Sequence, residues 1–266
     1  MKSGVIAKFR PKNRDHFPLV VMKFGGASLA TPRLVERAAE RIIQKLKTHN
    51  VVVVVSAMGD ETERLLHLTE NFSRIHNSAE VDTVLAAGEQ IAAGLMALAI
   101  SQKGIVARSY LAHQLALLTD GKHGDAEILS IDTEKLRFNL SENAVSVVAG
   151  FQGIDLEGRL VTLGRGGSDT SAVAIAAALA ADVCEFYKDV DAIYSADPKR
   201  NNLAQRHNFL SFEEMEKISE REPQILHDKA IKLAKKHHIR LHLRSAFNDN
   251  EGTHIEPSAQ KEGVFA

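Results

Sequence analysis

The stretch Leu19–Ser56 decides the fold, and it reads LVVMKFGGASLATPRLVERAAERIIQKLKTHNVVVVVS. It begins with Leu19–Phe24, a short apolar run typical of a buried strand. Thr31-Pro32 then opens a segment of helical period, whose apolar residues share one face: Leu34, Val35, Ala38, Ala39, Ile42, Ile43 and Leu46. The valines of Val51–Val55 lack alternation, so they predict a strand covered on both faces. These elements predict a βαβ unit in a parallel sheet between helical layers.

The same alternation of short apolar runs and helical segments continues along the chain. We predict further helices over Thr62–Arg74, Ala79–Gln102, Asp169–Ala181 and Ile225–His237, and one more after the capping box Ser211–Glu214. We predict strands over Ile105–Arg108, Ala144–Ala149, Val183–Tyr187 and Arg240–Ser245, and a hairpin over Ile154–Thr162. The pattern indicates an α/β fold with a largely parallel sheet, as two lobes split near Ala149-Gly150. We expect residues 1–18 to be a solvated lead-in and 257–266 a tail.

Composition excludes several classes of partner. Lys and Arg number 33 against 34 Asp and Glu in 266 residues, so no excess of positive charge is available for nucleic acid or an anionic membrane surface. Gln90, Gln102 and Asp182 interrupt the longest apolar stretches before they reach the roughly 20 residues of a membrane helix. The single cysteine, Cys184, lies in an apolar run and is interpreted as a buried thiol. We expect a cytoplasmic protein with small-molecule partners, no nucleic acid and no membrane.

The first segment with candidate chemistry is the turn Lys23–Ser28, between a strand and a helix. Gly25 and Gly26 let backbone N–H groups approach an anion, and Lys23 adds a positive charge. The spacing matches neither the P-loop nor the dinucleotide fingerprint, and a Gly-Gly turn beside a solvated lysine explains it equally well. The turn alone is therefore compatible with a phosphate site but does not require one.

The second segment is Leu163–Asp169, which reads LGRGGSD and again joins a strand to a helix. Its glycines expose the backbone, and Arg165 offers a fork-shaped donor for a carboxylate or phosphate. A tight turn needs one or two glycines, so the third favours anion binding over turn geometry alone. Asp169 could hold Lys23 in place and keep it charged, or it could simply favour the helix N-terminus.

Two further features could bind ligands. The segment Tyr187–Lys199 leaves a strand with aromatic, acidic and basic groups that could contact a nucleotide, although an ordinary surface loop explains it as well. Glu89 lies on an otherwise apolar helix, where a charge needs a partner such as a substrate ammonium, unless this face is exposed. We predict no metal site made of protein ligands, because the histidines match no zinc spacing.

Taken together and in order, these segments resemble the aspartokinase branch of the amino-acid kinase family, from about Leu19 to Ile255. The resemblance is carried by several motifs: Lys23–Ser28, Val55–Gly59, Gly88-Glu89, Gly150–Gly153, Thr162–Asp169, Tyr187–Lys199 and Arg244–Asn248. It implies a three-layer αβα sandwich with a largely parallel central sheet over 19–256, its N-lobe (19–149) on the substrate side and its C-lobe (150–256) on the nucleotide side. It also implies ATP and Mg²⁺, the metal held mainly through the phosphates, and transfer of the γ-phosphoryl group to the β-carboxylate of L-aspartate. This reaction is the first step toward lysine, threonine and methionine.

The resemblance also assigns roles to individual residues. Catalysis falls to Lys23, which would stabilise the transferring phosphoryl group, and to Asp169, which would organise it. Aspartate would be held by Ser28, Thr62, Glu89, Arg165, Gly166, Gly167 and Ser168. The nucleotide side would comprise Lys23, Gly25, Gly26, Lys188, Asp189, Tyr194, Asp197, Lys199, Gln224 and Ile225. This division agrees with phosphoryl transfer, in which positioning and charge neutralisation do most of the work.

The chain departs from the family pattern at a few positions. Ala27 replaces a threonine, and the usual Lys-Val-Leu-His-Pro segment reads Gln224-Ile225-Leu226-His227-Asp228, so a lysine expected near the nucleotide is missing. Loss of one charge-assisted hydrogen bond costs about 1.5–3 kcal/mol, so we expect ATP affinity roughly ten- to a hundredfold lower. Aspartokinases continue into ligand-sensing regulatory domains after the segment that corresponds to Gly252–Ile255, so the resemblance implies the catalytic domain alone.

Two alternatives to an active aspartate kinase remain at this point. One is a kinase of another small amino acid, which a panel of acceptor acids would reveal. The other is a nucleotide- or amino-acid-binding module without turnover, for which Ala27 and Gln224 are the motivation. A homodimer is compatible with the aspartate kinase and with both alternatives.

Overall fold

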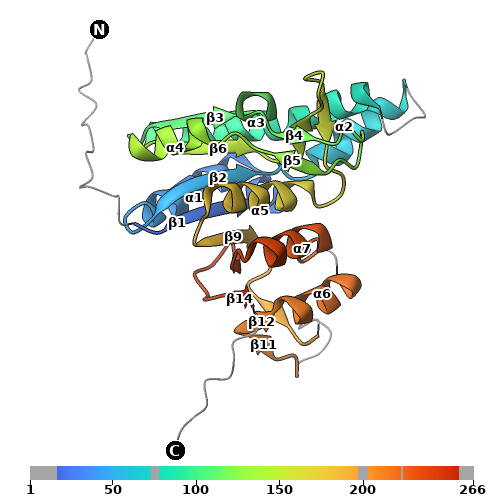
Figure 1. The fold of residues 1–266 in the computed structure, drawn as a ribbon. Helices are drawn as coiled ribbons and strands as arrows, with labels where there is room; N and C mark the ends of the chain where they lie inside the picture. The colour runs from blue at the N-terminus through green and yellow to red at the C-terminus, as the bar shows by residue number, and fades with distance from the viewer. Residues whose placement is uncertain (1–16, 73–77, 197–202, 223, 258–266) are drawn as a thin grey trace, which may run out of the picture.

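The computed structural model of the chain describes residues 17–72, 78–196, 203–222 and 224–257. The predicted lead-in and tail, and the sites Asp197 and Lys199, fall wholly or almost wholly outside these residues. The fold is built around one eight-stranded sheet with the strand order β12-β14-β13-β9-β1-β2-β6-β3 (Figure 1). Its strands are β1 (Leu19–Phe24), β2 (Asn50–Val55), β3 (Ala107–Tyr110), β6 (Val145–Ala149), β9 (Val183–Lys188), β12 (Phe209–Ser211), β13 (Leu241–Ser245) and β14 (Thr253–Glu256).

All neighbouring strands of this sheet run parallel except β13 and β14, which are antiparallel. The central strand β1 pairs with β2 on one side and β9 on the other, so the sheet runs without a break through both predicted lobes. In-register pairing places Lys23 beside Val54 and Phe186. The carboxyl ends of the central strands therefore meet at one edge, which is where an open α/β sheet binds its ligands.

Helices cover both faces of the sheet. One face packs against α1 (Pro32–Lys45) and α3 (Ala79–Gln102) through Met22 and Phe24. The other face packs, through Val21 and Val54, against four helices: α4 (Glu134–Ser141), α5 (Gly167–Leu179), α6 (Phe212–Arg221) and α7 (Asp228–His237). The α2 helix (Glu61–Glu70) packs on α3. Because β1 side chains alternate, its odd positions face α5 and its even positions face α1. The predicted three-layer αβα sandwich with a largely parallel sheet is confirmed.

A second, four-stranded sheet lies beside the first in the order β5 (Ile128–Ser130), β4 (Leu118–Thr119), β7 (Gln152–Ile154) and β8 (Leu160–Thr162). The β7–β8 hairpin matches the prediction, and Asp155 Oδ1 caps it by accepting hydrogen bonds from the amides of Glu157 and Arg159 at 2.9 Å each. A third sheet pairs β10 (Ile193–Tyr194) with β11 (Arg206–His207), and the described residues also form the short 3₁₀ helices η1 (Gly26–Leu29) and η2 (Ala112–Leu115).

Several boundaries differ from the prediction, and the starts of α7 and β3 are two of them. The α7 helix begins at Asp228 rather than Ile225, because His227 acts as its N-cap and accepts a hydrogen bond from the Lys229 amide at Nδ1. The β3 strand begins at Ala107, two residues later than expected, after a turn in which Gly104 has a φ of 82°. Neither shift changes the face that these elements present to the core.

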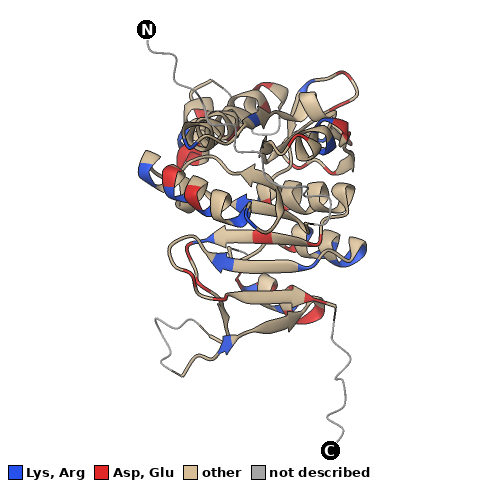
Figure 2. Cartoon of the chain, turned by 90° about the vertical axis from the view of Figure 1, so that its left-hand side faces the viewer, with Lys and Arg blue, Asp and Glu red and all other residues tan. Residues whose placement is uncertain are grey.

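The α3 helix corrects an expectation from the sequence. Its 24 residues are long and apolar enough to cross a membrane by length and composition, although the sequence indicated that no such stretch exists. In the fold α3 packs against α1, α2, β6 and β8, and it buries the carboxyl groups of Asp82 and Glu89. A soluble protein's core helix meets the same criterion, so this is weak evidence for a membrane span. Charged residues of both signs are distributed over the helices and strand ends (Figure 2).

Candidate active site

The first glycine turn fits tightly between two neighbouring segments. The Gly25 amide donates to the Tyr187 carbonyl at 3.1 Å, and the Ser28 hydroxyl donates to the same oxygen at 2.9 Å. A Cβ atom on Gly26 would lie 2.9 Å from the Gly59 carbonyl oxygen, so only glycine allows this approach. The turn is thus anchored to the end of β9, and the buried Ser28 hydroxyl is used in that anchoring.

Three charged groups meet at the carboxyl edge of the sheet. Lys23 Nζ lies 2.6 Å from Asp169 Oδ1, and Lys188 Nζ lies 2.9 Å from Asp169 Oδ2. Burial alone would raise the pKa of Asp169, but the ammonium groups of Lys188 and Lys23 together hold that pKa well below its ordinary value. Asp169 therefore stays ionised, and the predicted pairing of Asp169 with Lys23 is present.

The second glycine turn, Gly164–Gly167, opens α5 and delivers Asp169 to this position. Gly164 and Gly166 have φ values of 74° and 73°, and a Cβ on Gly166 would lie 2.3 Å from His227 Cβ. A Cβ on Gly167 would lie 2.9 Å from Leu163 Cβ and from the Phe151 ring. Backbone conformation and packing account for all the glycines of this turn, so the third glycine does not by itself indicate anion binding, and the predicted anion site stays a prediction. The amides of Ser168 and Asp169 nevertheless make no hydrogen bond to the described residues.

Glu89 is buried beside the same cluster. Its Oε1 accepts a hydrogen bond from the Ala57 amide at 3.0 Å, while Oε2 has no hydrogen-bond partner among the described residues. Burial raises the pKa of Glu89 to about 7, against the smaller lowering effects of the Ala57 amide, the amide of Glu89 itself, Lys23 and Ser168. Gly88 permits this geometry, because a Cβ there would lie 2.8 Å from Ala57 Cβ. An unpaired buried carboxyl oxygen is where a ligand ammonium would gain most.

A pocket of about 190 Å³ opens where the first turn meets the segment after β9. It is lined by Lys23, Gly25, Gly26, Ala27, Ser28, Lys188, Asp189 and Gln224. Lys188 Nζ lies 3.4 Å from the Gln224 carbonyl oxygen, which links the two predicted nucleotide segments. The structure therefore gathers most of the predicted phosphate and nucleotide residues around one cavity.

Several predicted residues lie elsewhere or make no contact. Arg165 is exposed and Thr62 is half-buried, and neither side chain forms a hydrogen bond or ion pair with the described residues. The Tyr194 hydroxyl donates to Asp191 at 3.2 Å, away from the residues that line the pocket. Ile225 packs into the hydrophobic core, where its side chain is 9% exposed. These four positions are therefore not gathered around the pocket.

Two features near the site were not found from the sequence. Phe151, which contacts the Gly167 position, has a φ of 68°, a conformation that a bulky residue adopts rarely and only under tertiary constraint. Asp82, fully buried on α3, was also missed, because its partners come from distant segments. The only sequence signal for Asp82 was a carboxylate on an apolar helix, the signal that identified Glu89.

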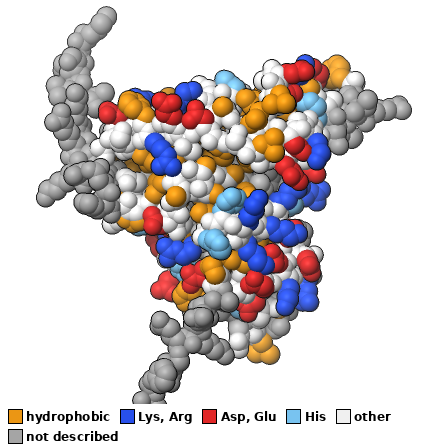
Figure 3. Space-filling model, viewed as in Figure 1, with side chains coloured by type: hydrophobic (Ala, Val, Ile, Leu, Met, Phe, Trp, Pro, Cys, Tyr) orange, Lys and Arg blue, Asp and Glu red, His pale blue; other side chains and the backbone are white. Residues whose placement is uncertain are grey.

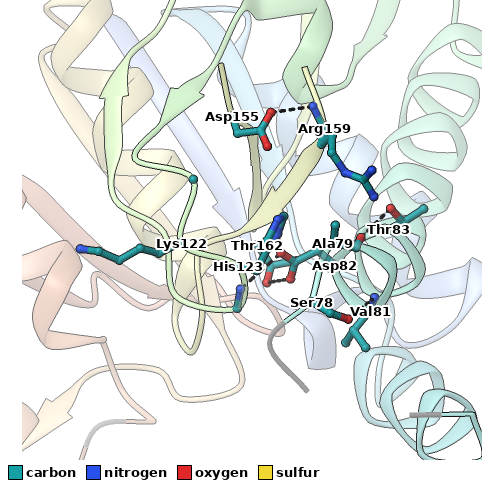
Figure 4. Close-up of polar contacts among 12 residues, drawn as sticks. Ser78, Ala79, Val81, Asp82, Thr83, Lys122, His123, Asp155, Arg159 and Thr162 are labelled. Carbon is teal, nitrogen blue, oxygen red and sulfur yellow. Dashed lines mark hydrogen bonds and ion pairs between the residues drawn. The ribbon is translucent and has the colours of Figure 1, made fainter. Parts of the chain in front are cut away.

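Asp82 ties three elements together (Figure 4). Its Oδ2 lies 2.7 Å from His123 Nδ1 and 3.3 Å from the Gly124 amide, while the Thr162 hydroxyl donates to Oδ1. Thr162 ends β8, directly before the second glycine turn, and a Cβ on Gly164 would lie 2.9 Å from the Gly124 carbonyl oxygen. Asp82 thus fixes the turn that leads into Asp169.

Comparison with known proteins agrees with this geometry. The model of the amino acid kinase family matches residues 18–245. The chain belongs to the amino acid kinase family. Among curated members, it is 43% identical over 244 residues to the aspartokinase of Mycolicibacterium smegmatis, covering 91% of this chain and 58% of that protein. The chain therefore spans a little over half the length of this relative.

Solved structures of family members share the fold. An aspartate kinase from Synechocystis superposes with a TM-score of 0.80 at 37% identity, over 90% of this chain and 40% of that one. Aspartokinase III of E. coli, determined with aspartate and ADP, has a TM-score of 0.82 at 23% identity, over 91% of this chain and 65% of that one. The second likeness concerns the fold alone.

Proposed function

We propose that this chain is the catalytic domain of an aspartate kinase, which phosphorylates the β-carboxylate of L-aspartate with ATP to give 4-phospho-L-aspartate. The observation that carries the proposal is the Lys23–Asp169–Lys188 cluster at the junction of the two glycine turns, with the unpaired Glu89 oxygen beside it. Similarity to aspartokinases supports this choice of substrate within the family. The domain would be a soluble cytoplasmic enzyme, and a homodimer is compatible with it.

The reaction needs charge neutralisation more than a protein nucleophile. A β-carboxylate oxygen of aspartate attacks the γ-phosphorus of ATP, a new P–O bond forms, and the bond to the bridging oxygen breaks as ADP leaves. No proton has to move. Two ammonium groups on one carboxylate leave a surplus of positive charge, which stabilises the transferring phosphoryl group.

Substrate selection would depend on the two ends of aspartate. The α-ammonium would pair with Glu89 Oε2, which otherwise has no partner, and the α-carboxylate would be held by the exposed guanidinium of Arg165 and the free amides at the start of α5. Thr62, Ser168 and the glycines 166 and 167 would complete this side. Glutamate, one methylene longer, would misplace its reacting oxygen.

ATP would extend from the pocket over the C-lobe. Its phosphates would contact Lys23, Lys188 and the amides of the first glycine turn, and its nucleoside would lie toward Asp189, Tyr194, Gln224 and Ile225, with Asp197 and Lys199 further along the same segment. The residues present fit a metal held mainly through the phosphates. Both oxygens of Asp169 already face lysines, which leaves Asp189 as the exposed carboxylate of the pocket. Mg²⁺, when bound, would neutralise phosphate charge.

Incubation with ATP, Mg²⁺, L-aspartate and hydroxylamine tests the proposal, because an acyl phosphate is trapped as aspartyl hydroxamate. We expect hydroxamate and ADP in equal amounts, and less product from glutamate or other small acids. A faster reaction with another acceptor acid would favour a different kinase of the family. Nucleotide binding without ADP formation at millimolar ATP would instead indicate a binding module and refute the kinase.

A further inference from the structure

The replacement at position 224 has a counterpart in the structure. The family pattern places a lysine there, beside the nucleotide, and this chain has the neutral Gln224. The pocket nevertheless contains a second ammonium, since Lys188 lies 2.9 Å from Asp169 Oδ2 and 3.4 Å from the Gln224 carbonyl oxygen. A cation is therefore present at this position of the site although residue 224 does not provide it.

We propose that Lys188 replaces the missing lysine and is a catalytic residue that contacts the transferring phosphoryl group. This inference rests on the proposed kinase function and deepens it. The family resemblance assigned Lys188 only to nucleotide binding, whereas this inference also gives it a part in the phosphoryl transfer. It also predicts that the loss of lysine at position 224 does not lower ATP affinity by the ten- to hundredfold that the sequence suggested.

The register of the sheet explains how Lys188 reaches the site. In β9, Cys184 and Phe186 pack into the core cluster that contains the α5 residues, so Lys188, two residues further on, points to the same face. The neighbouring strand β1 places Lys23 beside Phe186 on that face. Two adjacent parallel strands thus present two lysines to the N-terminus of α5, and the two oxygens of Asp169 separate the ammonium groups.

The charge balance indicates a role beyond pairing with Asp169. Lys23 and Asp169 are 6% exposed at the side chain and Lys188 is 12% exposed, so water screens this cluster weakly. One lysine would suffice to neutralise one carboxylate. Burial lowers the pKa of Lys188, and Lys23 lowers it further, whereas Asp169 and the more distant Asp189 raise it. An anion bound at this position would relieve the unfavourable proximity of the two ammonium groups, and a phosphate oxygen fits the pocket.

The geometry also favours the γ-phosphoryl group over the rest of the nucleotide. Lys188 shares Asp169 with Lys23, so its ammonium lies on the acceptor side of the pocket, next to the α5 turn that would hold aspartate. A lysine that served only the nucleoside would have no reason to approach this carboxylate. Lys188 should therefore matter more in the transition state than in binding ADP.

A double-substitution experiment tests the inference in the full chain. Lys188→Met, Gln224→Lys and the combined variant are assayed for phosphorylation of aspartate, and their dissociation constants for ADP and ATP are measured. We expect Lys188→Met to lower kcat about 10²-fold or more, as removal of a transition-state donor does. Adding Gln224→Lys to Lys188→Met should raise kcat at least tenfold above that of Lys188→Met, because a lysine at position 224 restores the missing cation. Gln224→Lys in the wild-type chain should raise kcat by a smaller factor.

Lys45→Met is the matched control, since Lys45 forms a comparable ion pair with Glu185 at 2.6 Å on the opposite face of β9. It should leave kcat within about threefold, whereas non-specific effects of losing a lysine would appear in both variants. The inference is overturned if Lys188→Met keeps kcat within threefold of wild type, or if Gln224→Lys gives no recovery in the Lys188→Met chain. If the wild-type chain binds ATP but makes no product, the kinase proposal fails. The contact of Lys188 with the γ-phosphate is then tested by binding alone. Weaker binding of ATP by Lys188→Met, with unchanged binding of ADP, supports the contact. An equal loss of affinity for ATP and ADP contradicts it.

Discussion

Glu89 allows the coupling between substrate recognition and stability to be measured. The residue is 2% exposed, and burial raises its pKa from an ordinary 4.5 to about 7. Because the folded-state pKa is the higher one, the stabilising contribution is complete below pH 4.5 and is lost as the pH rises through 7. Above pH 7 the folded chain must keep an ionised carboxylate with one oxygen unpaired, and this destabilises it.

The substitution Glu89→Gln removes that penalty and keeps the hydrogen-bond acceptor for the Ala57 amide. Linkage between the two pKa values predicts that the free energy of unfolding of Glu89→Gln, relative to wild type, increases by about 2 kcal/mol between pH 5.5 and pH 8.5. Urea unfolding at both pH values measures this difference. In the kinase assay, the same variant should have a KM for aspartate at least tenfold higher, because the ammonium loses its ionic partner.

Glu80→Gln, an exposed position on the first turn of the same helix, controls for loss of one negative charge. A stability difference between Glu89→Gln and wild type that does not change with pH would refute the reasoning. An unchanged KM for aspartate would separately remove Glu89 from substrate recognition. Saturating aspartate should also reduce the pH dependence of wild-type stability, because the bound ammonium favours the ionised carboxylate.

Three further predictions concern the elements around the cluster. Gly166→Ala should destabilise the chain by more than about 2 kcal/mol, because its Cβ would overlap His227. Gly158→Ala is the control for backbone strain: Gly158 has a φ of 80° and no atom within 4 Å of the added Cβ, so the substitution should cost only about 1 kcal/mol. Thermal unfolding of the two variants distinguishes packing from backbone strain. Thr162→Val should lower the free energy of unfolding by about 1–3 kcal/mol, because Asp82 loses a hydrogen-bond donor. Thr162→Ser keeps the hydroxyl group and should retain most of this free energy. Equal losses of the two variants in urea unfolding would mean that the hydroxyl does not matter. Asp169→Asn should lower kcat about 10²-fold or more through the displaced lysines, and steady-state kinetics with unchanged kcat would exclude this role.

The fold was largely predictable because its strands are recognisable by composition. The valine run of β2 and the apolar segments of β1, β6 and β9 are buried on both faces, so their positions depend on hydrophobic burial, which the sequence records directly. Short elements such as β4, β12 and β14 were missed. Their residues are held by pairing with distant strands, for example Leu241 with Ile255, and this information is not local.

The site was predictable in its components but not in its arrangement. Lys23, Glu89 and Asp169 stood out as charges in apolar or glycine-rich surroundings, which indicates a ligand or a partner. The approach of Lys188 to Asp169 and of Asp82 to Thr162 depends on strand register and on loops far apart in the chain. The glycines of the second turn were an ambiguous signal, because contacts with His227, Phe151 and Gly124 require them whether or not a ligand binds there.

The most direct measurement follows the phosphoryl group itself. Phosphorus NMR of the wild-type chain with ATP, Mg²⁺ and L-aspartate should show an acyl phosphate signal that grows with ADP in a one-to-one ratio, needs aspartate, and is lost in Asp169→Asn. ADP formation without an acyl phosphate, or an acyl phosphate that forms equally well in Asp169→Asn, would contradict the central claim that this lysine–aspartate–lysine cluster transfers phosphate to aspartate.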